Sequence, residues 1–147
     1  MNDCLVCREV AGEVELPGGC LIDEEHVLAF HVPPSEQYPR PYLGHMLLVT
    51  RRHAPGFEDL TDAEAAGIGV ATATLARALR AAGADHVFSS RIGTGVPHLH
   101  VHVVPRWPGT PDHVRWYEVD EWEGARRGGP AEVASFAAEL APSLATK

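Results

Sequence analysis

Near the middle of the chain runs the segment His98-Leu99-His100-Val101-His102-Val103-Val104, followed by Pro105-Arg106. Histidine alternates here with an apolar residue, and this period of two predicts a β-strand. Successive side chains of a strand point to opposite faces, so we expect the three imidazoles on one face and the apolar side chains in a core. Three imidazoles on one face bring nucleophilic, acid–base and metal-ligand chemistry together.

Two other interpretations of the histidine run compete with catalysis. Single histidines in strands usually serve packing or solvation, but three at strict alternation among valines and a leucine are unusual packing. The stronger rival is a metal site in which two or three of these histidines are ligands and none is a nucleophile. Metal analysis of variants distinguishes that rival from a catalytic face.

Length and composition indicate one globular domain. The chain has 147 residues, of which 45% are hydrophobic, and a chain of this length buries about two-thirds of its unfolded surface. A net charge of -8 argues against nucleic acid or an anionic membrane as a partner held by bulk electrostatics. No apolar run approaches the roughly 18 residues of a membrane span, and no leader pattern follows Met1. We therefore expect a soluble, cytoplasmic protein.

The remaining segments predict an α+β fold, with strands and helices in separate runs. A hairpin is expected over residues 21–32, and four prolines in residues 33–41 exclude a helix or central strand there. Thr61-Asp62-Ala63-Glu64 is a capping box that opens a helix to about Ala82, with Gly83 at its C-terminal cap. Further strands are expected at 45–50 and 86–92, and a last helix at 131–140.

The composition changes beyond Arg106. Trp107, Trp116 and Trp122 are interleaved with proline, glycine and charge, which indicates a tail laid over the sheet or exposed to a partner. We expect a single domain over residues 1–147, with its core at about 4–106 and the tail and C-terminal helix at 107–147.

The cysteines predict a metal site rather than disulfides. Cys4 and Cys7 form a Cys-x-x-Cys pair, and Cys20 stands alone and is interpreted as structural. A redox pair normally opens a helix after a strand, whereas this pair lies at the extreme N-terminus, which favours a metal. Two incidental buried thiols are the alternative.

A tetrahedral zinc needs two ligands besides the cysteine pair. The best candidates are His53, at the end of a predicted strand, and His98, at the start of the histidine strand, although spacing alone does not select His53. Such a closed ligand set makes the zinc structural and leaves His100 and His102 free for chemistry.

Together these residues resemble the histidine triad (HIT) superfamily, whose signature is three histidines alternating with apolar residues. The segment from His98 to Val104 matches that signature, and Cys4-x-x-Cys7 resembles the N-terminal pair of zinc-bearing members. Gly44-His45-Met46-Leu47-Leu48-Val49 with Arg51-Arg52-His53 resembles the family's Gly-His-x-Leu-Val-φ strand and its terminal Lys/Arg-x-His, where φ is apolar. The resemblance covers about two-thirds of the chain.

The resemblance implies a five-stranded antiparallel sheet with one long and one C-terminal helix, usually in a homodimer that acts on nucleoside phosphates. It assigns His100 as the nucleophile that attacks the α-phosphorus, giving a covalent nucleotidyl-histidine that water or another acceptor resolves. His102 would bind a phosphoryl oxygen or assist the leaving group, and His45 would do the same from the adjacent strand or serve as a core residue. Backbone N–H groups near Gly93 and Thr94 would receive developing charge.

Two positions depart from the family pattern. The family usually has a Gly-Gln pair before the histidines, where this chain has Gly93-Thr94, and the threonine hydroxyl reaches less far. The family's Phe-x-Asp, whose carboxylate accepts from the ribose hydroxyls, is here Phe30-His31-Val32. Because valine cannot bind a diol, we expect His31 or Glu36 to take that role.

Three functions remain open at this point. The first is a nucleotide hydrolase or phosphoramidase that works through a covalent His100 intermediate. The second is a nucleotidyltransferase or phosphorylase with the same intermediate. The third is a non-catalytic, zinc-stabilised nucleotide-binding module, which the altered ribose position and the tryptophan-rich tail favour. All three predict a small-molecule nucleotide partner and a structural zinc.

Overall fold

The computed structural model describes residues 3–93 and 95–145. Within these residues, five strands form one antiparallel sheet in the order β1-β2-β3-β5-β4, as the resemblance predicted. The elements are α1 (Leu5–Val10), β1 (Cys20–Asp23), β2 (Val27–His31), β3 (Met46–Thr50), η1 (Phe57–Asp59), α2 (Asp62–Ala81), β4 (His86–Ser90), β5 (His100–Arg106), η2 (Trp116–Glu118) and α3 (Pro130–Ala145).

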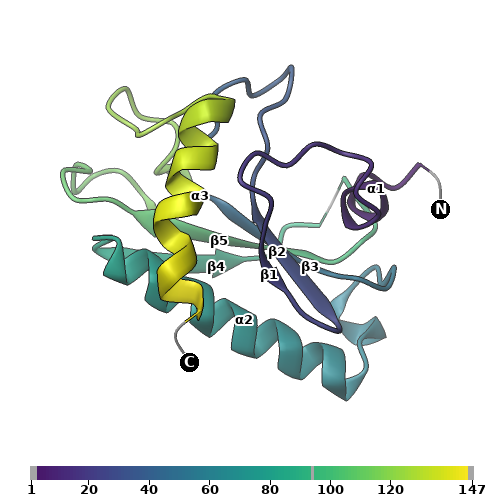
Figure 1. Ribbon diagram of the computed structural model, residues 1–147. Helices are drawn as coiled ribbons and strands as arrows, with labels where there is room; N and C mark the ends of the chain where they lie inside the picture. Colours follow the sequence, from purple (N-terminus) through teal and green to yellow (C-terminus); the bar gives the residue numbers. More distant parts are fainter. Residues whose placement is uncertain (1–2, 94, 146–147) are drawn as a thin grey trace.

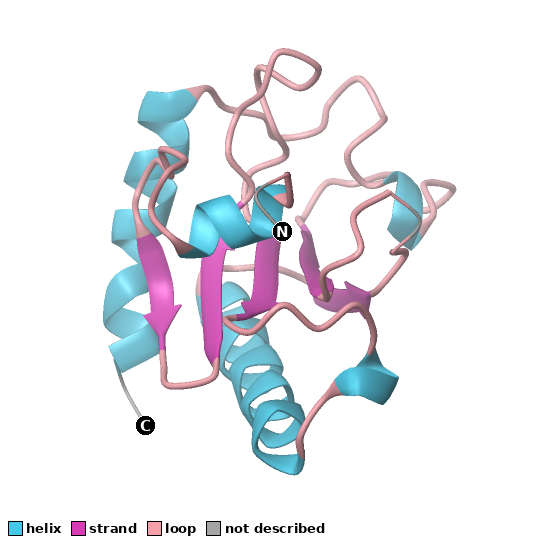
Figure 2. Cartoon of the chain, turned by 90° about the vertical axis from the view of Figure 1, so that its right-hand side faces the viewer, coloured by secondary structure: helices cyan, strands magenta, loops and turns pink. Residues whose placement is uncertain are grey.

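Helices cover the two faces of the sheet unequally. The long α2 and the C-terminal α3 pack on one face, where Ala29 of β2 and Leu48 of β3 belong to the larger core cluster (Figure 1). The short α1 lies on the opposite face, against Leu28 and Phe30 of β2 (Figure 2). Alternation along each strand therefore determines which side chains meet the large core and which meet the α1 face.

The ends of α2 follow the sequence signals. The Thr61 hydroxyl accepts from the Glu64 N–H and the Glu64 carboxylate accepts from the Thr61 N–H, which completes the capping box. The same carboxylate binds the Arg52 guanidinium through two hydrogen bonds of 2.8 Å. At the other end, Gly83 has a φ of +106° just beyond the cap residue Ala82, the left-handed conformation that glycine adopts without strain.

The histidine strand begins two residues later than expected. His98 lies in a bend before β5, which starts at His100. The ladder between β3 and β5 ends at the Val49–His100 pair, because the next groups have other partners. The Leu99 N–H donates to the Ala54 carbonyl at 2.7 Å, and the Nε2–H of the His98 ring donates to the Thr50 carbonyl at 2.7 Å.

The tail after β5 packs on its own domain. Trp107 is 3% exposed, donates its indole N–H to the Leu43 carbonyl at 2.8 Å and meets the Phe136 ring of α3 at 5.7 Å. Of the two placements predicted for the tail, Trp107 has the one over its own domain, because this side chain fills the junction between the sheet and α3. Trp122 is half-buried and Trp116 is exposed.

Cys20 is exposed at the start of β1 rather than packed in the core. Among the described residues, no helix combines the length and the apolar character that crossing a membrane requires.

Candidate active site and metal centre

Four predicted ligands come together where α1 meets the sheet. The Cys7 sulfur lies 3.2 Å from Nδ1 of His53 and 3.4 Å from Nδ1 of His98, and the Cys4 sulfur lies 3.5 Å from the same His98 nitrogen. All four ligand atoms lie within 4.8 Å of one another. The group could hold a metal ion, as the sequence predicted.

The donor set and its spacing fit a tetrahedral zinc. Bonds of about 2.3 Å to sulfur and about 2.0 Å to nitrogen place neighbouring sulfur and nitrogen ligands about 3.5 Å apart, close to the distances found here. The His98 ring is also oriented for ligation. Its Nε2–H donates to the Thr50 carbonyl at 2.7 Å, so the unprotonated Nδ1 faces the sulfurs. Nothing in the sequence indicates this role of Thr50 beyond its place at the end of a buried strand.

The backbone of His98 also fixes the next histidine of the run. The His100 Nδ1–H donates to the His98 carbonyl at 2.7 Å. This bond places the proton on Nδ1, so the lone pair of His100 is on Nε2. His100 is partly exposed, and its ring lies 5.4 Å from that of His102 on the same face of β5.

His45, directly before β3, and His102 of the neighbouring β5 form a hydrogen-bonded pair. Nε2 of His45 lies 2.8 Å from Nδ1 of His102. Burial, followed by the charge of His102, lowers the pKa of His45 to about 3, and burial followed by the charge of His100 lowers the pKa of His102. Both rings are therefore neutral near pH 7. When His45 donates, His102 presents Nε2–H, the donor that a phosphoryl oxygen or a leaving group needs.

A cavity of about 600 Å³ opens beside this pair, and both His45 and His102 line it. The volume suits a small-molecule ligand. Val32 lines the same cavity, so the position where the family carries its ribose-binding aspartate faces the ligand space with an apolar side chain. Sequence reasoning missed two other parts of the lining, Tyr38 of the proline-rich loop and the acidic pair Asp120 and Glu121 of the tail.

His31 does not lie in this cavity, and its predicted role in substrate binding is wrong. Residues 27, 29 and 31 of β2 share the face of the large core, and His31 is fully buried there against Phe136. Its Nδ1–H donates to the Val32 carbonyl at 2.8 Å, and its Nε2 accepts from the Gly44 N–H at 2.9 Å. Both ring nitrogens are thus used within the fold, so His31 is a structural residue.

Replacing His31 with leucine should destabilise the protein by about 2 kcal/mol, because the buried Gly44 N–H loses its acceptor. Burial lowers the pKa of His31. The folded-state pKa thus lies below the unfolded value of about 6.5, and the contribution of this residue is present above that pH and is lost as the pH falls. Urea unfolding from pH 8 to 5 should show the difference from wild type shrinking in acid. His113→Leu, at an exposed position, is the control, and weaker nucleotide binding at unchanged stability would contradict the structural role.

The loop before β5 holds the two remaining predicted phosphate contacts. Gly93 has a φ of +68°, and the Arg91 guanidinium lies where a side chain would project, so this position requires glycine. Gly93 is not among the residues that line the cavity of His45 and His102. Thr94 lies outside the described residues.

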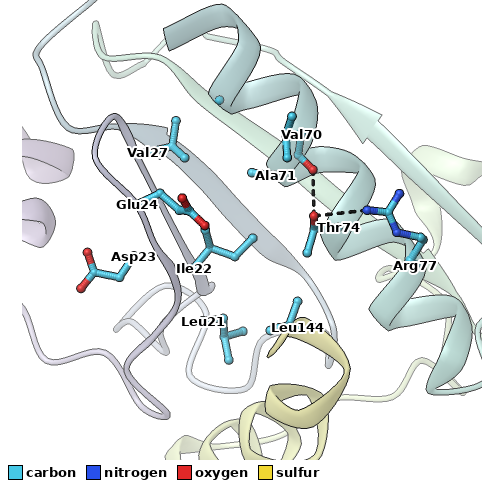
Figure 3. Close-up of a pocket in the computed structure, with 11 residues that line it drawn as sticks. Leu21, Ile22, Asp23, Glu24, Val27, Val70, Ala71, Thr74, Arg77 and Leu144 are labelled. Atoms are coloured by element: carbon cyan, nitrogen blue, oxygen red, sulfur yellow. Dashed lines mark hydrogen bonds between the residues drawn. The ribbon is translucent and has the colours of Figure 1, made fainter. Parts of the chain in front are cut away.

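A second cavity, of about 430 Å³, lies on the other side of the sheet (Figure 3). The β1–β2 hairpin, α2 and Leu144 of α3 enclose it, and the Thr74 hydroxyl on its wall donates to the Val70 carbonyl. None of the predicted site histidines lines it. The cavity with titratable groups suited to phosphate chemistry is therefore the one beside His45 and His102.

Comparisons with known proteins agree with this arrangement. The chain is 28% identical to an uncharacterized HIT-like protein of Methanocaldococcus jannaschii over 122 residues, which cover 79% of this chain and 88% of that protein. It is 37% identical to an AP-4-A phosphorylase of Mycobacterium tuberculosis over 73 residues, which are 45% of this chain and 37% of that protein.

Its fold is similar to that of a solved structure, a Zn-bound histidine triad family protein from Mycobacterium smegmatis. The TM-score is 0.72 at 24% sequence identity, and the likeness covers 98% of this chain and 94% of that chain. The model of the HIT domain matches residues 13–109, a range that includes His45, His53 and the whole histidine run. On this match, and on the five-stranded sheet that carries the run, the chain belongs to the HIT domain family.

Proposed function

We propose that this protein binds a nucleoside phosphate derivative and cleaves it at the α-phosphorus, with Nε2 of His100 as the nucleophile. The supporting observation is the hydrogen bond from His100 Nδ1–H to the His98 carbonyl. It directs the lone pair of His100 away from the backbone, as attack on phosphorus requires. The product of attack is a nucleotidyl-histidine, which water then hydrolyses.

His102 and His45 would handle the phosphate and the leaving group in this proposal. Both rings are neutral near pH 7, so when His45 donates to Nδ1 of His102, the Nε2–H of His102 is the donor that would bind a phosphoryl oxygen, without a full positive charge. Their mutual hydrogen bond fixes the orientation of His102 next to His100. The Nε2–H of His102 would donate a hydrogen bond to the leaving group, and the hydrogen bond from His45 would hold the His102 tautomer that carries this proton.

Cys4, Cys7, His53 and His98 would hold a structural zinc. Four protein ligands close the coordination sphere, so the bound ion supplies a cross-link and leaves no open position for substrate. The cross-link fastens α1 to the sheet beside His98, whose carbonyl orients His100.

A transferase is the second candidate, because the chain has a relative named AP-4-A phosphorylase. In that case phosphate, rather than water, would resolve the nucleotidyl-histidine. We also propose a cytoplasmic homodimer, on the family resemblance. Light scattering during gel filtration measures the mass in solution.

Intact-protein mass spectrometry tests the proposed intermediate. The zinc-loaded protein is mixed briefly with nucleoside 5′-phosphoramidates and dinucleoside polyphosphates, and the released nucleotide is measured in parallel. We expect an adduct with the mass of a nucleoside monophosphate. Nucleoside monophosphate released in water, and nucleoside diphosphate released with added orthophosphate, distinguish hydrolase from phosphorylase. Nucleotide binding without adduct or release would favour the non-catalytic binding module.

A further inference from the structure

We propose that Asp120, with Glu121 beside it, recognises the sugar hydroxyls of the substrate. The proposal rests on the function proposed above and assigns a specificity role to the tail after β5. It adds two carboxylates as hydrogen-bond acceptors to a site where Val32, directly after β2, offers no side-chain acceptor.

The first observation is the place of the two carboxylates. Both residues line the cavity of His45 and His102, together with Val32 and Tyr38. Asp120 is half-buried and Glu121 is exposed. Neither carboxylate forms a hydrogen bond or an ion pair with any other residue in the described ranges 3–93 and 95–145. Asp120 is therefore a half-buried acceptor, free of internal donors, in a ligand-sized space.

The second observation is the way in which the tail holds these residues. The Arg127 guanidinium also lines the cavity, but it donates to the backbone carbonyls of Asp120 and Trp122. It therefore fixes the backbone of the turn and leaves the Asp120 carboxylate unpaired. Val119, directly before Asp120, is 2% exposed and belongs to the large core.

The same tail is attached to the edge of the proline-rich loop. Arg127 pairs with Tyr42 in an antiparallel bridge, the Leu43 N–H donates to the Arg126 carbonyl at 2.8 Å, and the Gly128 N–H donates to the Pro41 carbonyl at 3.1 Å. These contacts join the two walls of the cavity into one structure. The backbone that carries the two carboxylates thus has a fixed position relative to the imidazoles, as selective recognition requires.

The chemistry of the two side chains indicates which part of the ligand they would bind. An ionised carboxylate only accepts hydrogen bonds, and it repels a phosphate. With the phosphate bound at His102, which lines the cavity, the neighbouring donors of a nucleotide are the hydroxyls of its sugar. An exocyclic amine of the base is the other donor that a carboxylate could bind, so the experiment must distinguish the two.

A double-mutant cycle on binding tests the assignment without requiring turnover. Isothermal titration calorimetry measures the affinity of the zinc-loaded protein for AMP and for its 2′-deoxy, 3′-deoxy and 2′,3′-dideoxy forms. Wild type is compared with Asp120→Asn and with Asp120→Asn/Glu121→Gln. Glu118→Gln is the matched control, because this acidic residue of the same turn does not line the cavity. Inosine monophosphate tests the amine of the base.

We expect wild type to bind AMP at least about tenfold more tightly than the dideoxy form, the effect of losing a hydrogen bond to a charged group. The double variant should discriminate less between the two forms, because its neutral amides form weaker hydrogen bonds to the hydroxyls than the carboxylates do. The control should behave as wild type. Circular dichroism and thermal unfolding confirm that the variants are folded.

The other outcomes separate this proposal from the one on which it rests. Equal sugar discrimination in wild type and the double variant overturns the role of the carboxylates, while nucleotide binding itself stands. Discrimination between AMP and inosine monophosphate that depends on Asp120 assigns the carboxylates to the base and overturns the sugar contact. If wild type binds none of the nucleotides with any common base, both proposals fail together.

Discussion

Replacing His100 with alanine should reduce turnover by about 1000-fold or more while nucleotide affinity stays within about threefold of wild type. The reason is geometric. The His100 Nδ1–H donates to the His98 carbonyl, so Nε2 of His100 carries the lone pair that is available for attack. His45 and His102 bind each other through one nitrogen apiece. The site therefore loses its nucleophile but keeps its phosphate donor, the Nε2–H of His102.

Single-turnover release of nucleotide and titration calorimetry measure the two quantities separately. His113→Ala, an exposed position in the tail, should change neither. Full turnover by His100→Ala would rule out the covalent mechanism. Turnover absent from both wild type and variant, with binding intact in both, would identify a binding module.

Replacing Cys7 with serine should abolish zinc binding and lower stability by about 3 kcal/mol, near 10 °C in melting temperature. Cys7 is chosen because its sulfur contacts the ring nitrogens of both His53 and His98. Without the metal, the six-residue α1 depends on its contacts with the small apolar cluster around Phe30. A helix of this length is not stable alone.

Elemental analysis and thermal unfolding, with and without a chelator, measure these effects. Cys20→Ser is the matched control, because this exposed thiol is not a member of the metal cluster. We expect about one zinc per chain in wild type and in the control, and a chelator-sensitive melting temperature in both. If instead zinc is retained in Cys7→Ser and lost in His100→Ala or His102→Ala, the metal is bound by the histidine run.

The alternation of the histidine run was sufficient to predict much of this architecture. It assigned Val101 and Val103 to the core and His100 and His102 to one shared face, and the β5 register agrees. The same rule applied to β2 would have corrected one error. His31 is two residues from Ala29 and therefore faces the large core, whereas Val32 faces the cavity.

Other features depend on contacts that no local pattern encodes. The ring of His98 donates a hydrogen bond to the Thr50 carbonyl, so β5 begins only at His100. The alternation of histidine with apolar residues nevertheless includes His98. Asp120 and Glu121 reach the cavity because the tail pairs with residues 41–43, more than 75 positions earlier in the chain. Acidic residues between tryptophans carry no signal of such a long-range placement.

His98 contributes its side chain to the metal cluster and its backbone carbonyl to the orientation of His100. Its side chain faces the cysteines, whereas its carbonyl orients His100. Every amino acid carries that carbonyl, so mutation can remove the ligand without removing the acceptor. An evolving lineage could therefore exchange its metal centre for another way of fastening the N-terminus and inherit the nucleophile intact.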